Sequence, residues 1–111
     1  MQTLYSITGT KPTDTPSDIE GRNFLRHAQV TVVPLDAQGD PIVDGTETGK
    51  VLVQGIPVGA TTPDATKFQE EVPIAVGGSV VLEGFFSKIL ITPKTIAVAA
   101  SLKVQVTQSA T

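Results

Sequence analysis

The sequence lacks cysteine and tryptophan altogether, and it contains a single histidine, His27. The absence of cysteine excludes a disulfide framework, a thiolate zinc site and a cysteine nucleophile. One histidine excludes any catalytic pair or metal site that needs two imidazoles. We therefore predict a protein with no catalytic residues and no cofactor.

Basic residues are few and dispersed. The chain has 8 Lys and Arg against 11 Asp and Glu, which gives a formal net charge of −3, and no two basic residues are adjacent. Proteins that bind DNA or RNA through phosphate groups normally show a basic excess, because each neutralised phosphate needs a Lys or Arg. We expect no direct contact with nucleic acid.

Long apolar runs are absent as well. The first residues, MQTLYSITGTK, show no basic segment followed by an apolar one, which is the pattern of a signal peptide. No apolar run approaches the roughly 20 residues that span a bilayer. Unless a leader has been removed, we expect a protein that is made in the cytoplasm and does not contact a membrane.

Residue types that suit β-sheets dominate what is present. The chain has 111 residues, the size of one domain, and 42 of them are Val, Ile, Thr, Phe or Tyr. The 10 glycines and 8 prolines are spread along the chain, which is typical of turns between short strands. The composition therefore predicts many short strands and little helix.

The order of apolar residues and turn residues places these strands. In the closing segment, Leu102, Val104 and Val106 alternate with polar residues, which indicates a strand with one buried face. The long apolar run over 79–92 contains Gly84, where we expect a bend that carries the chain from one sheet to another or around a barrel. The predicted strands cover residues 4–8, 24–35, 41–43, 50–56, 72–76, 79–92 and 101–108.

The pattern predicts an all-β fold, either an antiparallel β-sandwich or a small β-barrel of about seven or eight short strands. No predicted helix is long enough for the crossover of a parallel sheet. Residues 1–21 are polar and proline-containing, and we expect them to form an extended N-terminal arm, with one helical turn near 15–18 as the alternative. Residues 22–111 form the single β domain, in which 60–71 is either a short helix or a polar loop.

The turn after the second predicted strand contains a possible metal site. Gly39 can take the left-handed conformation that closes a type I turn, and Pro41 restricts the returning strand to an edge. Asp36, Asp40 and Asp44 stand four residues apart around this turn. They are weak calcium candidates, because clustered carboxylates can bind Ca²⁺, but aspartate is also a favoured turn residue, and the spacing differs from that of an EF-hand.

Two other polar features do not indicate catalysis. The adjacent carboxylates Glu70 and Glu71 would point in different directions on either a strand or a helix, so by themselves they cannot face each other across a cleft. His27 has no serine in a Gly-x-Ser-x-Gly motif to activate, and we interpret it as a surface or interface histidine. No catalytic residue is predicted.

Adjacent aromatic residues suggest a contact surface. In a strand, Phe85 and Phe86 would point to opposite faces, so that one ring can fill the core while the other needs a second layer, a folded-back arm or another subunit. We predict contacts with other copies of the chain. The interface candidates are Phe85, Phe86 and the arm residues Leu4, Tyr5, Ile7, Pro12 and Pro16.

The C-terminal third resembles a known class of protein. The segments GSVVLEGFF (78–86), ILITP (89–93) and LKVQVTQ (102–108) are similar to the ends of small structural virion proteins of tailed bacteriophages, and the hairpin over 30–42 resembles β-sandwich domains of phage and bacterial surface proteins. The resemblance implies a non-enzymatic protein located in the virion and assembled in the host cytoplasm.

This resemblance also implies a role and partners. The implied role is decoration or cementing of a capsid, in which strand edges and the arm contact neighbouring subunits and stabilise the particle. The implied partners are further copies of the chain and the major capsid protein or a tail protein. The alternative is a binding module for carbohydrate or a host surface, associated with a tail or an adhesin.

Overall fold

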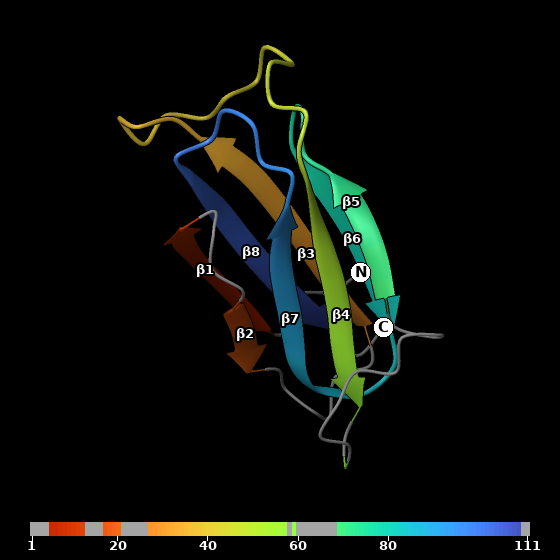
Figure 1. Ribbon diagram of the computed structural model, residues 1–111. Helices are drawn as coiled ribbons and strands as arrows, with labels where there is room; N and C mark the ends of the chain where they lie inside the picture. The colour runs from red at the N-terminus through yellow and green to blue at the C-terminus, as the bar shows by residue number, and fades with distance from the viewer. Residues whose placement is uncertain (1–4, 13–16, 21–26, 58, 60–68, 110–111) are drawn as a thin grey trace.

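The computed structural model describes residues 5–12, 17–20, 27–57, 59 and 69–109. Within these residues the chain forms eight strands and no helix (Figure 1). The strands are β1 (Tyr5–Pro12), β2 (Ser17–Glu20), β3 (His27–Leu35), β4 (Lys50–Pro57), β5 (Gln69–Pro73), β6 (Gly78–Glu83), β7 (Phe86–Lys94) and β8 (Ser101–Ser109).

The strands form two four-stranded antiparallel sheets that pack face to face. Sheet A has the order β1-β8-β3-β6, and sheet B has the order β2-β7-β4-β5. This order is that of a jelly roll, in which two Greek keys wrap around one core. The prediction of an antiparallel all-β fold is confirmed, and of its two forms the chain adopts the sandwich.

The core follows from alternation along the strands. In β8 the predicted inward residues Leu102, Val104 and Val106 are buried, and Val104 and Val106 lie opposite Val32 and Val30 of β3. Sheet B contributes a matching inner row, because every second side chain of a strand points to the same face. That row includes Val51, Val53, Val72, Ile89 and Ile91.

Gly84 is the point at which the chain crosses between the sheets, as the sequence predicted. β6 ends at Glu83 in sheet A, Gly84 has a φ of 136°, and β7 begins at Phe86 in sheet B. A positive φ of this size is accessible mainly to glycine. Beyond the crossing, the ring of Phe86 lies against Gly55 of β4, where a side chain would collide with it.

The N-terminal segment pairs with the strands of the sandwich. Residues 5–12 form β1, which pairs with β8 along its whole length, and residues 17–20 form β2, which pairs with β7. These residues are extended, as expected, but they pair with both sheets, and Ser17 and Asp18 lie in a strand, so the helical alternative is wrong for them. The division into an arm (1–21) and a domain (22–111) remains a prediction. Pairing satisfies the backbone hydrogen bonds of this polar segment, which a free arm would leave to water.

Two other expectations concern connecting segments. Residues 60–68 lie outside the described residues, while Gln69–Pro73 form β5, so residues 69–71 belong to a strand. The turn prediction is confirmed: Gly39 has a φ of 84°, and its N–H donates to the carbonyl of Asp36 at 3.0 Å. The returning strand is reduced to one bridge between Leu35 and Pro41.

No described segment forms a helix of the length and apolar character needed to cross a membrane.

Candidate functional site: a locked loop end

Three connecting segments meet at one end of the sandwich, which we call the loop end (Figure 1). They are the β3–β4 loop (36–49), the β5–β6 turn (74–77) and the β7–β8 loop (95–100). Main-chain hydrogen bonds link the segments: the N–H of Ile74 donates to the carbonyl of Gly49 at 3.3 Å, and the N–H of Ala100 donates to that of Leu35 at 2.9 Å. The loops are therefore fixed to one another and to the sheet.

A buried carboxylate lies between two of these loops. Glu47 is fully buried. Its Oε2 accepts hydrogen bonds from the N–H groups of Gly49 at 2.8 Å and Ala97 at 2.9 Å, while its Oε1 accepts from Val98 at 2.9 Å and Ala99 at 2.7 Å. Four backbone donors thus surround one side chain, and the β3–β4 loop is held to a segment about fifty residues later in the chain.

The electrostatics of this site keep Glu47 ionised. Burial by itself raises the pKa of Glu47, because it penalises the charged form. The N–H groups of Ala97, Ala99, Val98 and Gly49 outweigh burial and lower the pKa from its ordinary value of 4.5 to about 2. A group of backbone amides that points at one anion stabilises its charge in the way that anion-binding loops do.

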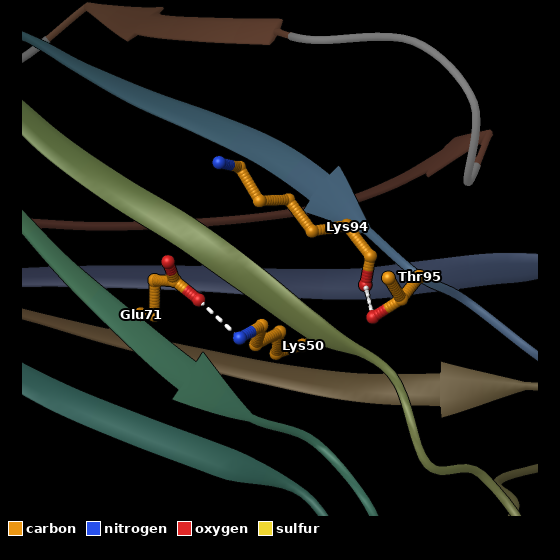
Figure 2. A network of polar contacts seen from close by, with 4 residues as sticks. All are labelled: Lys50, Glu71, Lys94 and Thr95. Carbon is orange, nitrogen blue, oxygen red and sulfur yellow. Dashed lines mark hydrogen bonds and ion pairs between the residues drawn. The ribbon is translucent and has the colours of Figure 1, made fainter.

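Two backbone features allow the loops to close around Glu47. Gly49 has no room for a side chain, because a Cβ atom there would lie 2.8 Å from the Cα of Ile96 and 2.9 Å from Oε2 of Glu47. Thr95 has a φ of 53°, and its hydroxyl donates to the carbonyl of Lys94 at 2.7 Å (Figure 2). A β-branched residue in this conformation is uncommon, so the β7–β8 loop begins with a strained residue.

The loop end exposes apolar side chains. Val43, Val76 and Val98 each belong to one of the three loops, and their exposed fractions are 64%, 65% and 53%. Single exposed valines are ordinary, but these three lie on loops that hydrogen bonds hold to one another at the same end of the sandwich. The main chain of Val98 is itself bonded to Glu47, so its backbone is held in place.

The outer face of sheet B carries charged residues close to this end. Lys50 and Glu71 form an ion pair between β4 and β5, and Lys94 of β7 lies opposite Lys50 in register (Figure 2). The hydrogen bond and positive charge of Lys50 lower the pKa of Glu71. Glu70 and Glu71 are both exposed, as expected for carboxylates in solvent. An ion pair at the surface, such as that of Lys50 and Glu71, contributes little to stability.

The aspartates of the predicted turn make local hydrogen bonds. Oδ1 of Asp36 accepts the N–H groups of Gln38 and Asp40, both at 2.9 Å, and Oδ1 of Asp44 accepts the N–H and hydroxyl of Thr46. The Thr46 hydroxyl is the main reason that the pKa of Asp44 is lowered. These are the bonds that the turn interpretation expects. The calcium interpretation of Asp36, Asp40 and Asp44 remains a hypothesis; the described residues contain no cluster of three or more potential metal-ligating side chains.

His27 is the first residue of β3, a strand that lies between β8 and β6 in sheet A. Its Nε2 lies 3.6 Å from Oε1 of Glu83 on the neighbouring strand β6. Its Nδ1 is buried and has no hydrogen-bond partner among the described residues. The histidine is thus partly buried beside a carboxylate.

The interface candidates fall into three groups. Phe86 is fully buried in the core of its own subunit, so of the aromatic pair only Phe85, which is 51% exposed, is available to a partner. Pro12 is exposed at the end of β1. Tyr5 and Ile7 lie on β1 with side chains that are not described, and Leu4 and Pro16 lie outside the described residues.

Sequence reasoning missed Glu47 and the valines of the loop end. Glu47 stands in the polar segment Thr46-Glu47-Thr48, which gives no periodic signal. Its partners are four backbone N–H groups, three of them about fifty residues away, and a backbone donor leaves no trace in the residue types. The one available signal was Gly49, since a glycine two residues after an isolated Glu in a loop is consistent with a close approach of the backbone.

Comparisons with known proteins give a fold but no family. No family model and no curated protein matches the chain. A solved structure of a Bacillus endospore appendage, one of a family of disulfide-linked pili, is 14% identical with a TM-score of 0.51, over 96% of this chain and 87% of that one. At this identity the similarity shows a common fold alone.

Two further solved structures also align along most of the chain. A designed double-stranded β-helix has a TM-score of 0.46 at 10% identity, over 96% of this chain and 100% of that one. The SPBc2 prophage-derived protein YomS has a TM-score of 0.45 at 10% identity, over 96% of this chain and 98% of that one.

Proposed function

We propose that this protein is a non-enzymatic structural virion protein that decorates or cements a particle by binding neighbouring subunits. The observation that carries the proposal is the loop end, where Val43, Val76 and Val98 are exposed on loops that hydrogen bonds hold in fixed positions. The partner is the capsid or tail protein on which the loop end docks.

The physical argument concerns the cost of binding. A flexible loop loses conformational freedom when it binds, whereas a loop that is already ordered loses little. Glu47 and the main-chain bonds order these loops in the free protein. A partner that covers the three valines therefore gains the benefit of apolar burial without first ordering the loops.

Two likenesses support a role in assembly. The C-terminal segments 78–86, 89–93 and 102–108 resemble small virion proteins of tailed bacteriophages. The endospore appendage of comparable fold belongs to a pilus, so a sandwich of this kind is used as a building block. That pilus is disulfide-linked, whereas this chain has no cysteine, so its contacts with neighbours would include no disulfide.

The proposal is tested by binding to particles assembled without this protein. Purified protein is mixed with such shells and tails and sedimented, and the bound fraction is measured over a concentration series. We expect saturable binding that the double substitution Val43→Asp with Val98→Ser weakens at least ~10-fold, since hot-spot residues dominate interface energies. The matched control is Gln105→Asp, on the exposed outer face of β8.

The outcomes separate the proposal from its alternative. Binding that the double variant retains would contradict the loop end as the docking surface. Failure of the wild-type protein to bind shells or tails, together with retention on an immobilised carbohydrate, would overturn the structural role and favour the binding module.

A further inference from the structure

The four edge strands of the sandwich differ in how well they are protected from pairing with another chain. β1 carries Lys11 and Pro12 at one end, β5 carries Glu70, Glu71 and Pro73, and β2 has only four residues. Prolines, charges and short length are the usual protections of an edge. Three of the edges that the structure describes therefore have such a device.

β6 has none of these features except a terminal Glu83. Its sequence, GSVVLE, contains no proline and no lysine, and its register with β3 runs without a bulge from Gly78 to Glu83. Within the described part of the chain, β6 pairs only with β3, so its other side is a free edge of sheet A (Figure 1). A regular strand with an open side is a template for one more strand.

Exposed apolar side chains gather at this strand. Val81 lies in the middle of β6 and is 49% exposed, while Val76 precedes the strand and Phe85 follows it. The structure thus leaves three large apolar residues uncovered on β6 and immediately beyond its two ends. A single strand laid along β6 would pass all three.

We propose that β6 pairs antiparallel with β6 of a second copy about a two-fold axis at Val81, which joins the two A sheets into one. A two-fold interface must be self-complementary, because each residue meets the surface of its own kind. With the axis at Val81, Val80 lies opposite Leu82 of the second copy and Ser79 lies opposite its Glu83. Around Val81 the strand reads alike in both directions, with an apolar residue on each side followed by a polar one.

This register also gives suitable partners to the charged residue Glu83 and to the exposed apolar residues beyond the two ends of β6. Each Glu83 carboxylate meets a serine hydroxyl, which can donate a hydrogen bond to it, and no two carboxylates face each other. Moving the axis to Glu83 would instead place the two carboxylates directly opposite, which is destabilising in a sheet. With the axis at Val81, Phe85 comes to lie beside Gly77 and Val76 of the second copy.

β5, the neighbouring edge strand of sheet B, is protected from pairing by Glu70, Glu71 and Pro73. The inference deepens the proposed function, because it names one of the surfaces through which the protein would assemble. Its evidence is the β6 edge, which shares Val76 but not Val43 or Val98 with the loop end, so the two can fail separately.

The mass of the protein in solution tests the pairing. Size-exclusion chromatography with light scattering over a dilution series should show a dimer for the wild-type chain. Val81→Lys should weaken the dimer ~100-fold, since a lysine on an open edge is an effective block to pairing. Gln105→Lys adds the same charge to the outer face of sheet A away from the edge and should leave the dimer unchanged.

A cysteine variant gives a second, direct reading. The chain has no native cysteine, so Val81→Cys under mild oxidation with glutathione can link two copies only through position 81. We expect a disulfide-linked dimer with Val81→Cys and none with Gln105→Cys at the same concentration, because directly opposite Cβ atoms lie within about 5.5 Å.

A wild-type chain that stays monomeric throughout the series would overturn the inference. So would a dimer that Val81→Lys leaves intact and Val81→Cys fails to cross-link. If Val81→Lys does not fold by circular dichroism, the cross-link decides. Loss of particle binding with an intact β6 dimer would instead contradict the proposed function alone.

Discussion

At the scale of single residues, Glu47 shows how a buried charge can stabilise a surface. A carboxylate removed from water is costly unless its oxygens are satisfied. Here each oxygen receives two backbone N–H groups, from Gly49 and Ala97 on one side and Val98 and Ala99 on the other. The Glu47 side chain holds the β3–β4 loop and the β7–β8 loop together, and its loss would release both.

Glu47→Gln tests this role. The amide retains one acceptor oxygen but places its NH₂ group against two N–H donors, so that buried donors lose their partner. We expect the free energy of unfolding to fall by about 2–4 kcal/mol, as measured by urea denaturation. Glu70→Gln, an exposed change of the same kind on β5, should stay within about 0.5 kcal/mol of the wild type. Equal denaturation midpoints for the two variants would contradict the account.

The same residue predicts how stability depends on pH. The pKa of Glu47 is lowered from 4.5 to about 2 in the folded chain, so its contribution is complete above pH 4.5 and is lost as the pH falls toward 2. In Glu47→Gln the fall in stability over this range should be smaller by about 2–3 kcal/mol. Asp44 and Glu71 also have lowered pKa values, but both are exposed and should contribute much less. Identical pH profiles for the variant and the wild type would contradict the assignment.

At the scale of strands, alternation decides which side chains enter the core. Val104 is 5% exposed on the inner face of β8, while the next residue, Gln105, is exposed. Val104→Asp buries an unpaired carboxylate at a cost of several kcal/mol, against a domain stability of roughly 5–15 kcal/mol. We expect the variant to be largely unfolded by circular dichroism, whereas Gln105→Asp should melt close to the wild type. A Val104→Asp chain that melts within a few degrees of the parent would show that the facing is wrong.

The N-terminal strands predict that removing them destabilises the domain. An arm could be removed without harm to the domain, but β1 covers the full length of β8, and β2 covers part of β7. Deletion of residues 1–18 should therefore cost at least about 2 kcal/mol, which is roughly 10 °C in melting temperature for a domain of this size. A chain that lacks only residues 1–3 is the control. An unchanged melting temperature after the longer deletion would support the arm interpretation.

The sequence predicted those features that depend on neighbouring residues. Alternation identified β8 and its inner face, Gly39 identified the turn, and Gly84 identified the crossing between sheets. It did not predict that the N-terminal segment joins both sheets, because that segment is polar and contains Pro12 and Pro16. Its placement depends on β8 and β7, about 70 to 100 residues away, which supply the hydrogen-bond partners.

The candidate site was less accessible to sequence reasoning than the fold. The expectation of one exposed and one buried ring at Phe85 and Phe86 is confirmed, although Phe85 lies in the crossing between β6 and β7 and not in a strand. The loop end was not anticipated, because Val43, Val76 and Val98 lie in different loops and only the jelly-roll order brings these loops together. A surface of this kind is a property of topology rather than of any local motif.

At the scale of the whole molecule, the two proposed surfaces, the loop end and the β6 edge, adjoin at Val76. We propose the loop end, with its exposed valines, as the surface for a different protein, and the open edge of β6 as the surface for a second copy. Together they would let one chain bind the particle and pair with its neighbour.

Electron cryomicroscopy of particles assembled in the presence of this protein tests the central claim most directly. The account predicts density for an eight-stranded sandwich on the shell or the tail, with the loop end at the surface of the underlying protein. Particles that never contain the chain, or density in which the loop end faces solvent with no neighbour near it, would contradict the account.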